Sequence, residues 1–328
     1  MIGSNLVKRL RAAGHQVMVV DNLWRGKLEY LLEGGRPIID LEKDFRQCDL
    51  SEPHCLDGLL EDVGLIYHLA DVVAGIDYVF KNQGMIFRQN LLINSNVIAA
   101  ARRAPSLKGF IYVGTACSFP AHLQSGVDAR PLKEEDQYPA APESAYGWGK
   151  LMGEYETMLL EREAGIPVSI LSLHNVYGAP CDYGRERSQV LPSLIRRAIE
   201  HPDTDFTVWG SGNQGRAFVH VDDVVTALVL AMQRGLGRGV IQIGPQGCTT
   251  IRQIAETIAT ISGKKMEIKY DLSKPEGDRG RSADCAKAKA VLGWTPSVTL
   301  SAGLKRLYDW IEAQMRAARH TARTPLNP

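Results

Sequence analysis

Short apolar strands alternate with helices along the first half of the chain, and this alternation restricts the possible folds most strongly. Strands are expected at 16–20, 65–69, 110–113 and 168–173, with helices at 4–13, 90–103 and 144–163. Strands separated by helices predict a doubly wound α/β fold with a parallel sheet. Such sheets bind ligands at the carboxyl ends of their strands, where Asp21, Thr115 and Asn175 are expected.

The residue composition and the expected element lengths change after residue 175. Glycine and arginine become frequent, the expected strands at 206–209 and 240–243 are short, and a helix is expected at 250–262. We interpret this part as a smaller, discontinuous substrate domain. The predicted division is a cofactor domain at 1–174 plus about 215–242, a substrate domain at about 175–214 and 243–314, and a tail at 315–328.

Charge and cysteine usage exclude several classes of protein. The formal net charge is +1, so no overall field would recruit nucleic acid or an anionic membrane. No apolar run approaches membrane-spanning length and no secretory signal is recognisable, which predicts a cytoplasmic protein. The six cysteines show neither a Cys-x-x-Cys pair nor a zinc spacing, so we expect reduced thiols and no metal site.

The segment Tyr146-Gly-Trp-Gly-Lys150 supplies a potential base and a cation to tune it. Residues four apart on a helix lie on the same face, one turn from each other. The ammonium group of Lys150 is therefore expected to lower the pKa of Tyr146 from about 10 towards neutrality. Thr115, at the end of an expected strand, could share the hydrogen bond to a substrate hydroxyl. The sequence thus predicts oxidation of a sugar alcohol.

The beginning of the chain contains the second half of a dinucleotide-binding fingerprint. Gly3 opens an expected helix, where a pyrophosphate binds, and Asp21 follows at the position that holds the adenosine ribose. The first half, a strand with earlier glycines, is absent from the sequence. We therefore expect a truncated sheet that lacks its central first strand and exposes the edges of two neighbouring strands. An acid at the ribose favours NAD over NADP.

Several further motifs occur in order along the chain: Asp49-Leu50, His68-Leu69-Ala70, and the segments 174–178, 214–218 and 221–223. Together with Tyr146 and Lys150 they resemble the extended short-chain dehydrogenase/reductases that act on nucleotide sugars. The resemblance covers essentially the whole chain. It implies a Rossmann-like fold and a homodimer packed through the helices that carry Asn90 and Tyr146. The NAD-binding residues that we expect are Gly3, Asp21, Asn22, Asp49, Leu50, Leu69, Ala70, Tyr146 and Lys150.

Within this superfamily the segments 116–120, 138–147, 184–186 and 275–281 most resemble the GDP-mannose 3,5-epimerases. The resemblance implies that Cys117 is one member of an acid–base pair acting at C3 and C5 of the sugar. The chain departs from the family at four positions: Arg187 stands where the family has the lysine partner of that cysteine, Asp71 replaces an alanine, Ser172 replaces an arginine, and Phe119 is a mild change of an aromatic residue. Arginine is too basic to exchange protons readily.

These observations lead to one hypothesis for function and two alternatives. Thr115, Cys117, Tyr146 and Lys150 form the expected catalytic set of an NAD-dependent epimerase with a transient 4-keto sugar. The first alternative is a UDP-sugar 4-epimerase, acting for example on UDP-glucose or UDP-glucuronate. The second is a non-catalytic protein that binds NAD or a nucleotide sugar, favoured by the incomplete fingerprint. The diphosphate of a GDP- or UDP-hexose is expected to contact Asn175, Arg216, Arg279 and Arg281.

Overall fold

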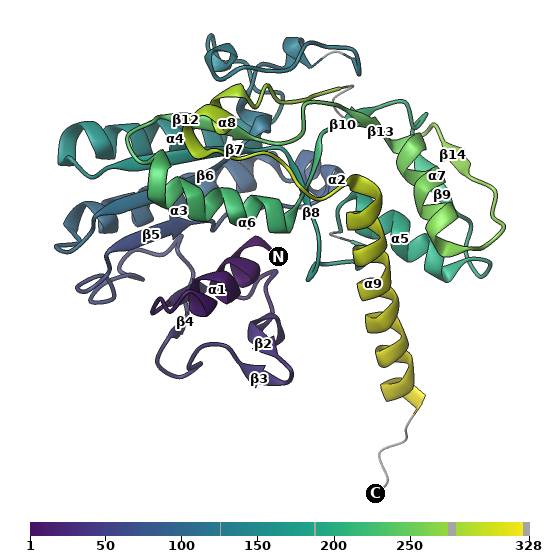
Figure 1. Cartoon of the computed structure of the whole chain (residues 1–328), viewed down its shortest axis with the longest axis horizontal. Coiled ribbons are helices and arrows are strands. Elements are labelled where there is room, and N and C mark those ends of the chain that lie inside the picture. The colour runs from purple at the N-terminus through teal and green to yellow at the C-terminus, as the bar shows by residue number, and fades with distance from the viewer. Residues whose placement is uncertain (125, 187, 275–279, 324–328) are drawn as a thin grey trace, which may run out of the picture.

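The main sheet of the protein is parallel and lies at the centre of the molecule (Figure 1). The computed structural model describes residues 1–124, 126–186, 188–274 and 280–323. The sheet has the order β12-β7-β6-β5. Its strands are β5 (Leu65–His68), β6 (Gly109–Thr115), β7 (Val168–Leu173) and β12 (Val240–Ile243). Pairing of β6 with β7 continues to Thr115 opposite Leu173, which places Thr115 at the carboxyl edge.

Helices cover both faces of this sheet, as strand β6 shows. Phe110 and Tyr112 pack into a cluster with residues of α3 (Gln83–Arg103) and α4 (Ala145–Ala164). The alternate residues Ile111 and Val113 face the opposite cluster, with α1 (Ile2–Ala12), α6 (Val221–Leu230) and α8 (Ala286–Leu292). A strand buried on both faces is typical of parallel sheets. The predicted doubly wound, Rossmann-like fold is confirmed.

The parallel strands nearest the N-terminus do not join the main sheet. Strand β1 (Val19–Asp21) pairs with β4 (Phe45–Gln47), in parallel, from Val19 opposite Phe45 to Asp21 opposite Gln47. Among the described strands, none pairs with β1 on its other side or with the outer edge of β5. Residues of both strands and of α1 line a cleft between them.

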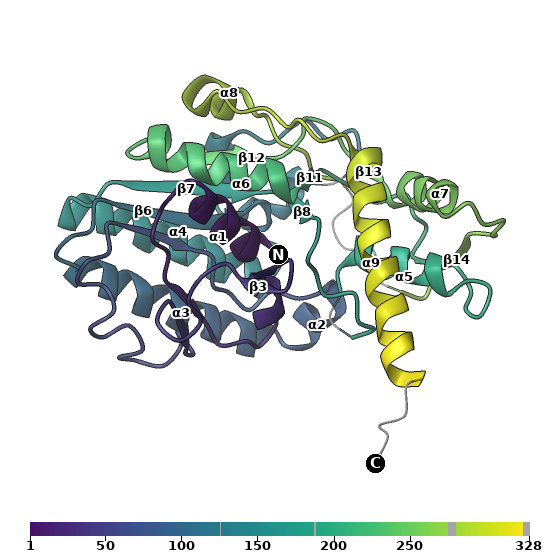
Figure 2. The same ribbon diagram turned by 60° about the horizontal axis from the view of Figure 1, so that its bottom comes forward.

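A second hydrophobic cluster lies beside the main sheet, towards the C-terminal part of the chain (Figures 1 and 2). It joins α5 (Val190–Glu200), α7 (Ile251–Ser262), α9 (Leu300–Arg323) and the parallel pair β9 (Thr207–Trp209) and β14 (Lys269–Asp271). Ile195, Ile254 and Leu304 at its centre are fully buried. This cluster is built from residues of the part of the chain that was expected to form the substrate domain, and that division stays a prediction.

The remaining elements are short and connect these parts. They are β2 (Leu32–Glu33), β3 (Arg36–Pro37), α2 (Ile76–Lys81), β8 (Asn175–Tyr177), β10 (Gly215–Arg216), β11 (Phe218–His220) and β13 (Thr249–Thr250). Parallel pairing of β8 with β11 carries the chain out of the main sheet immediately after β7. Among the residues that the structure describes, no helix has both the length and the apolar character needed to cross a membrane.

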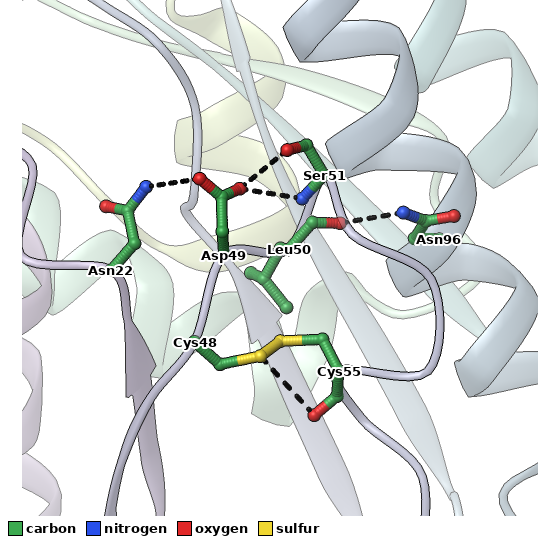
Figure 3. Close-up of a disulfide and its surroundings, with 7 residues drawn as sticks. All are labelled: Asn22, Cys48, Asp49, Leu50, Ser51, Cys55 and Asn96. Atoms are coloured by element: carbon green, nitrogen blue, oxygen red, sulfur yellow. Dashed lines mark hydrogen bonds between the residues drawn. A yellow bond between two sulfur atoms is a disulfide. The ribbon is translucent and has the colours of Figure 1, made fainter.

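The expectation that all six cysteines are reduced thiols is wrong for two of them. Cys48 and Cys55 form a disulfide, with their Cα atoms 6.1 Å apart, a separation that suits a disulfide. The bridge closes the loop that contains Asp49 and Leu50 (Figure 3). Spacing alone did not reveal it, because Cys48 and Cys55 approach each other only through the turn that follows β4. Cys117, Cys181, Cys248 and Cys285 are free thiols.

Candidate active site

Helix α4 brings Tyr146 and Lys150 below the end of strand β6. The helix begins after Ser144, whose hydroxyl accepts a hydrogen bond from the Gly147 amide at 3.3 Å. Tyr146 therefore lies in the first helical turn, beside Thr115, and the hydrogen bond between their side chains lowers the pKa of Tyr146. The Lys150 ammonium donates to the Val113 carbonyl at 2.7 Å. Tyr146, Lys150 and Thr115, which the sequence groups as a site, are thus brought together.

The electrostatics of this group differ from the expectation. Burial raises the pKa of Tyr146 well above its usual value, and the carboxylate of Asp71 raises it further. Asp71 also forms an ion pair with Lys150, with 3.2 Å between Oδ2 and Nζ, and both side chains are buried. Asp71 therefore offsets the charge of the cation that was expected to lower the pKa of Tyr146, and the pKa of Tyr146 stays above its usual value. The sequence shows Asp71 as a departure from the family but not its contact with Lys150.

Cys117 lies two residues after Thr115, in the short 3-10 turn Ala116–Ser118. The backbone amide of Cys117 donates to the Thr115 hydroxyl at 3.2 Å, which ties the two residues to each other. Nη1 of Arg281 is 3.4 Å from the Cys117 sulfur and donates to Oε1 of Gln124 at 2.9 Å. Arg281, expected as a diphosphate ligand, is buried against the thiol. The structure therefore places a thiol with a neighbouring cation beside Tyr146.

The expected adenosine end of the site is built from the ends of β1 and β4. Asp21 accepts a hydrogen bond from the Leu23 amide at 2.7 Å, and Asn22 donates to Asp49 at 3.1 Å (Figure 3). Hydrogen bonds from Ser51 hold the pKa of Asp49 below its usual value, so this acid is ionised. At Gly26 a Cβ atom would lie 3.2 Å from the Asp21 carboxylate, so a larger residue would crowd the acid.

One continuous cleft with a volume of about 1550 Å³ joins this end to the tyrosine. It is lined by most of the expected cofactor residues: Gly3, Asp21, Leu50, Leu69, Ala70, Tyr146 and Lys150. Asn22 and Asp49 are not among the residues that line it, although they are hydrogen-bonded to each other. A dinucleotide needs an acid at one end of a long groove and the reacting groups at the other, with a helix N-terminus between them. The cleft has this arrangement, so the described residues fit NAD.

The same cleft continues to the residues expected to bind the sugar diphosphate. Asn175 opens β8 and Arg216 lies in β10, and both line the cleft together with Thr115, Cys117 and Arg281. The side-chain oxygen of Asn175 is buried and has no hydrogen-bond partner among the described residues. A buried polar atom of this kind suits a polar ligand. Arg279 and Arg187 lie outside the described residues.

Glu154 is a further buried acid that the sequence did not single out. It follows Lys150 by one helical turn and is fully buried. Gln137 donates to its Oε2 at 3.0 Å, and burial raises the pKa of Glu154 to about 7. Its spacing of four residues from Lys150 was the available signal, but a spacing does not show that a carboxylate is buried.

The doubly wound sheet and the strand-end threonine above a Tyr-x-x-x-Lys helix define an extended short-chain dehydrogenase/reductase. The chain belongs to the NAD dependent epimerase/dehydratase family, whose model matches residues 1–244. Membership of this family confirms the predicted NAD cofactor. When NAD is bound, it supplies reversible two-electron oxidation at an alcohol carbon.

Individual relatives differ in their named substrates. GDP-mannose 3,5-epimerase from Arabidopsis thaliana is 32% identical over 316 residues, covering 96% of this chain and 80% of that protein. Among solved structures, UDP-glucose 4-epimerase from Thermotoga maritima, with UDP-glucose, superposes with a TM-score of 0.82 at 27% identity and 96% coverage of both chains. UDP-glucuronic acid 4-epimerase from Bacillus cereus, with UDP-glucuronic acid and NAD, has a TM-score of 0.79 at 27% identity, covering 95% of this chain and 96% of that one.

Proposed function

We propose that this chain is a nucleotide-sugar epimerase that works through a transient 4-keto sugar and changes the configuration at C3 or C5, as GDP-mannose 3,5-epimerase does by name. The observation that carries the proposal is the position of Cys117. Its thiol follows Thr115, contacts Arg281 and lines the same cleft as Tyr146. An oxidation at C4 needs one acid–base group, Tyr146, whereas proton exchange at a neighbouring carbon needs a second acid–base group beside it.

The proposed roles follow from the geometry of the side chains. Thr115 and Tyr146 hold the C4 hydroxyl and remove its proton as C4 is oxidised. A ketone at C4 makes the hydrogens on C3 and C5 acidic, and Cys117 exchanges one of them. Arg281 holds the thiol in place, while Asn175 and Arg216 are available to the diphosphate. The C4 ketone is reduced again at the end, so the cofactor is regenerated.

A UDP-sugar 4-epimerase is the second candidate, because structures with that name superpose over nearly the whole chain at 27% identity. Such a reaction would use Tyr146, Lys150 and Thr115 but would leave Cys117 without a role. Rotation of the 4-keto sugar and reduction from its other face would invert C4 alone. The two candidates therefore differ in whether carbon-bound hydrogens at C3 and C5 exchange with solvent.

Proton exchange in heavy water tests both candidates. The protein is incubated with NAD and either GDP-mannose or a UDP-hexose, and NMR follows the sugar protons at C3, C4 and C5. We expect deuterium at C3 or C5 of GDP-mannose, and loss of this exchange in Cys117→Ala with oxidation at C4 retained. A second version of the protein carries a strand and a Gly-x-x-Gly turn ahead of Met1, designed to fill the gap beside β1. It is measured in parallel.

Inversion at C4 of a UDP-sugar without exchange would support the 4-epimerase instead. NAD binding without any change in either sugar, in both versions of the protein, would rule out an epimerase and leave a nucleotide-binding protein.

A further inference from the structure

Asp71 lies at the centre of the site and is used by none of the roles above. It belongs to the loop after β5, lines the cleft, and has a side chain only 4% exposed. Its Oδ2 is 3.2 Å from Nζ of Lys150, but neither carboxylate oxygen has a partner with good hydrogen-bond geometry among the described residues. A buried carboxylate with so little compensation is costly, so its position beside the reacting groups requires an explanation.

The ionisable groups that interact with Asp71 are Tyr146 and Lys150 of α4 and Tyr112 of β6. Three more lie one contact further out: His68 of β5 and Glu154 of α4 interact with Lys150, and Cys117 after β6 interacts with Tyr146. Burial lowers the pKa of His68 to about 3, so His68 is neutral at the pH of a cell. Lys150 is therefore the cation that balances Asp71, and Asp71 in turn cancels the charge that would otherwise favour a tyrosinate.

The pairing of Asp71 with Lys150 determines how Tyr146 can take up a proton. A neutral Tyr146 can accept the proton of a substrate hydroxyl only if it passes its own proton on. Burial raises the pKa of the Asp71 carboxyl overall, while the neighbouring Lys150 ammonium and Tyr146 hydroxyl lower it in part. A carboxylate with a raised pKa is a better proton acceptor than an ordinary one. Asp71 is thus placed and tuned to receive the tyrosine proton.

Resting on the proposed function, we propose that Asp71 is a proton-accepting residue that acts through Tyr146. As the substrate is oxidised at C4, the substrate hydroxyl proton moves to the Tyr146 oxygen, and the former Tyr146 proton moves to Asp71. Bound NAD would accept the hydride from C4, which is one proton with two electrons, so that charge and atoms balance. On reduction of the ketone, Asp71 returns its proton to Tyr146, and Tyr146 returns one to the sugar.

The first test needs no cofactor and no substrate. Ultraviolet absorbance follows tyrosinate formation with pH, and Tyr146→Phe identifies the contribution of Tyr146. We expect Tyr146 to ionise at lower pH in Asp71→Asn and Asp71→Ala than in the wild type, since the carboxylate that opposes the phenolate is gone. Asp71→Asn keeps the volume of the side chain in case Asp71→Ala does not fold. Titration curves that coincide with the wild type would overturn the proposal, whatever the turnover.

The second test is the pH profile of turnover. At pH 7 we expect Asp71→Asn to lose about 100-fold or more in kcat, the usual scale of acid–base catalysis, and to recover as Tyr146 ionises at higher pH. Asp309→Asn is the matched control, because Asp309 forms an exposed ion pair with Lys305 on α9. Its profile should match the wild type.

The two proposals fail in different ways. Full activity of Asp71→Asn at pH 7, with the wild-type profile, would show that Asp71 only balances the charge of Lys150. An inactive wild type would instead contradict the proposed function, and the proton transfer with it, even if the titration of Tyr146 shifts.

Discussion

At the scale of single residues, burial of Glu154 is expected to make the free energy of unfolding depend on pH. Its pKa rises from the usual 4.5 to about 7 because the folded chain removes the carboxyl from water. Below pH 4.5 both folded and unfolded states hold the proton. Between pH 4.5 and 7 the unfolded chain ionises first, so the free energy of unfolding falls as pH rises, and above pH 7 the loss is complete.

Glu154→Gln should remove this loss, since an amide oxygen can still accept the hydrogen bond from Gln137. We expect the free energy of unfolding of the variant to equal that of the wild type near pH 4.5 and to exceed it by about 3 kcal/mol above pH 7. Urea unfolding of both proteins at several pH values measures the difference. A gain that is the same at pH 5 and pH 8 would mean that ionisation of Glu154 is not its cause.

The sequence identified the residues of the site whose chemistry depends on a local pattern. Tyr146 and Lys150 are four apart on one helix, and Thr115 follows a recognisable strand. Asp71 and Arg281 acquire their partners only through tertiary packing, across 79 and 164 positions of the chain respectively. Their contacts with Lys150 and Cys117 therefore could not be predicted from spacing.

At the scale of elements, the first turn of α4 is held closely against the turn that contains Cys117. A Cβ atom at Gly147 would overlap the carbonyl oxygen of Cys117 and lie 2.9 Å from Cβ of Pro142. Gly147→Ala should therefore displace Tyr146 from Thr115. We expect a loss of about 1–3 kcal/mol in stability, the usual cost of overpacking, and at least a tenfold loss of turnover.

Gly149→Ala is the matched control on the same helix. There a Cβ atom would meet Asn90 at 3.4 Å, an ordinary contact, and alanine favours a helix by about 1 kcal/mol over glycine. Thermal unfolding should show Gly149→Ala at or above the wild-type Tm. Equal Tm values and activities for the two variants would contradict the close contact at Gly147.

Most element positions followed from local patterns, but their assembly did not. The strands 168–173 and 240–243 occur at the predicted residues, whereas the helix expected at 90–103 begins earlier, at Gln83. Residues 83–89 contain a glycine, which weakens the local helix pattern, and packing of Ile86 in the core stabilises the helix there. The Cys48–Cys55 disulfide also depends on a fold of the loop after β4 that no spacing shows.

At the scale of the whole molecule, the outer surface of α3 and α4 suggests how two copies would associate. The helices are joined by hydrogen bonds from Ser95 to Glu156 at 2.8 Å and from Arg102 to Glu163 at 3.0 Å. Their exposed apolar side chains are Met85, Leu92, Trp148 and Tyr155. Each helix contributes a pair spaced by seven residues, which places both members on one face. We propose that this α3–α4 apolar face forms the interface of a homodimer.

Charged residues on this face should separate the two copies without unfolding either one, because the substituted side chains are already partly exposed. We expect the wild type to sediment at twice the 36.1 kDa of one chain, and the double variant Leu92→Glu, Tyr155→Glu to sediment as a monomer. Leu272→Glu is the control, since Leu272 is 74% exposed and lies just after β14, away from α3 and α4. A dimer that survives the double variant would place the interface elsewhere. A wild-type monomer would show that the apolar face stays open to solvent.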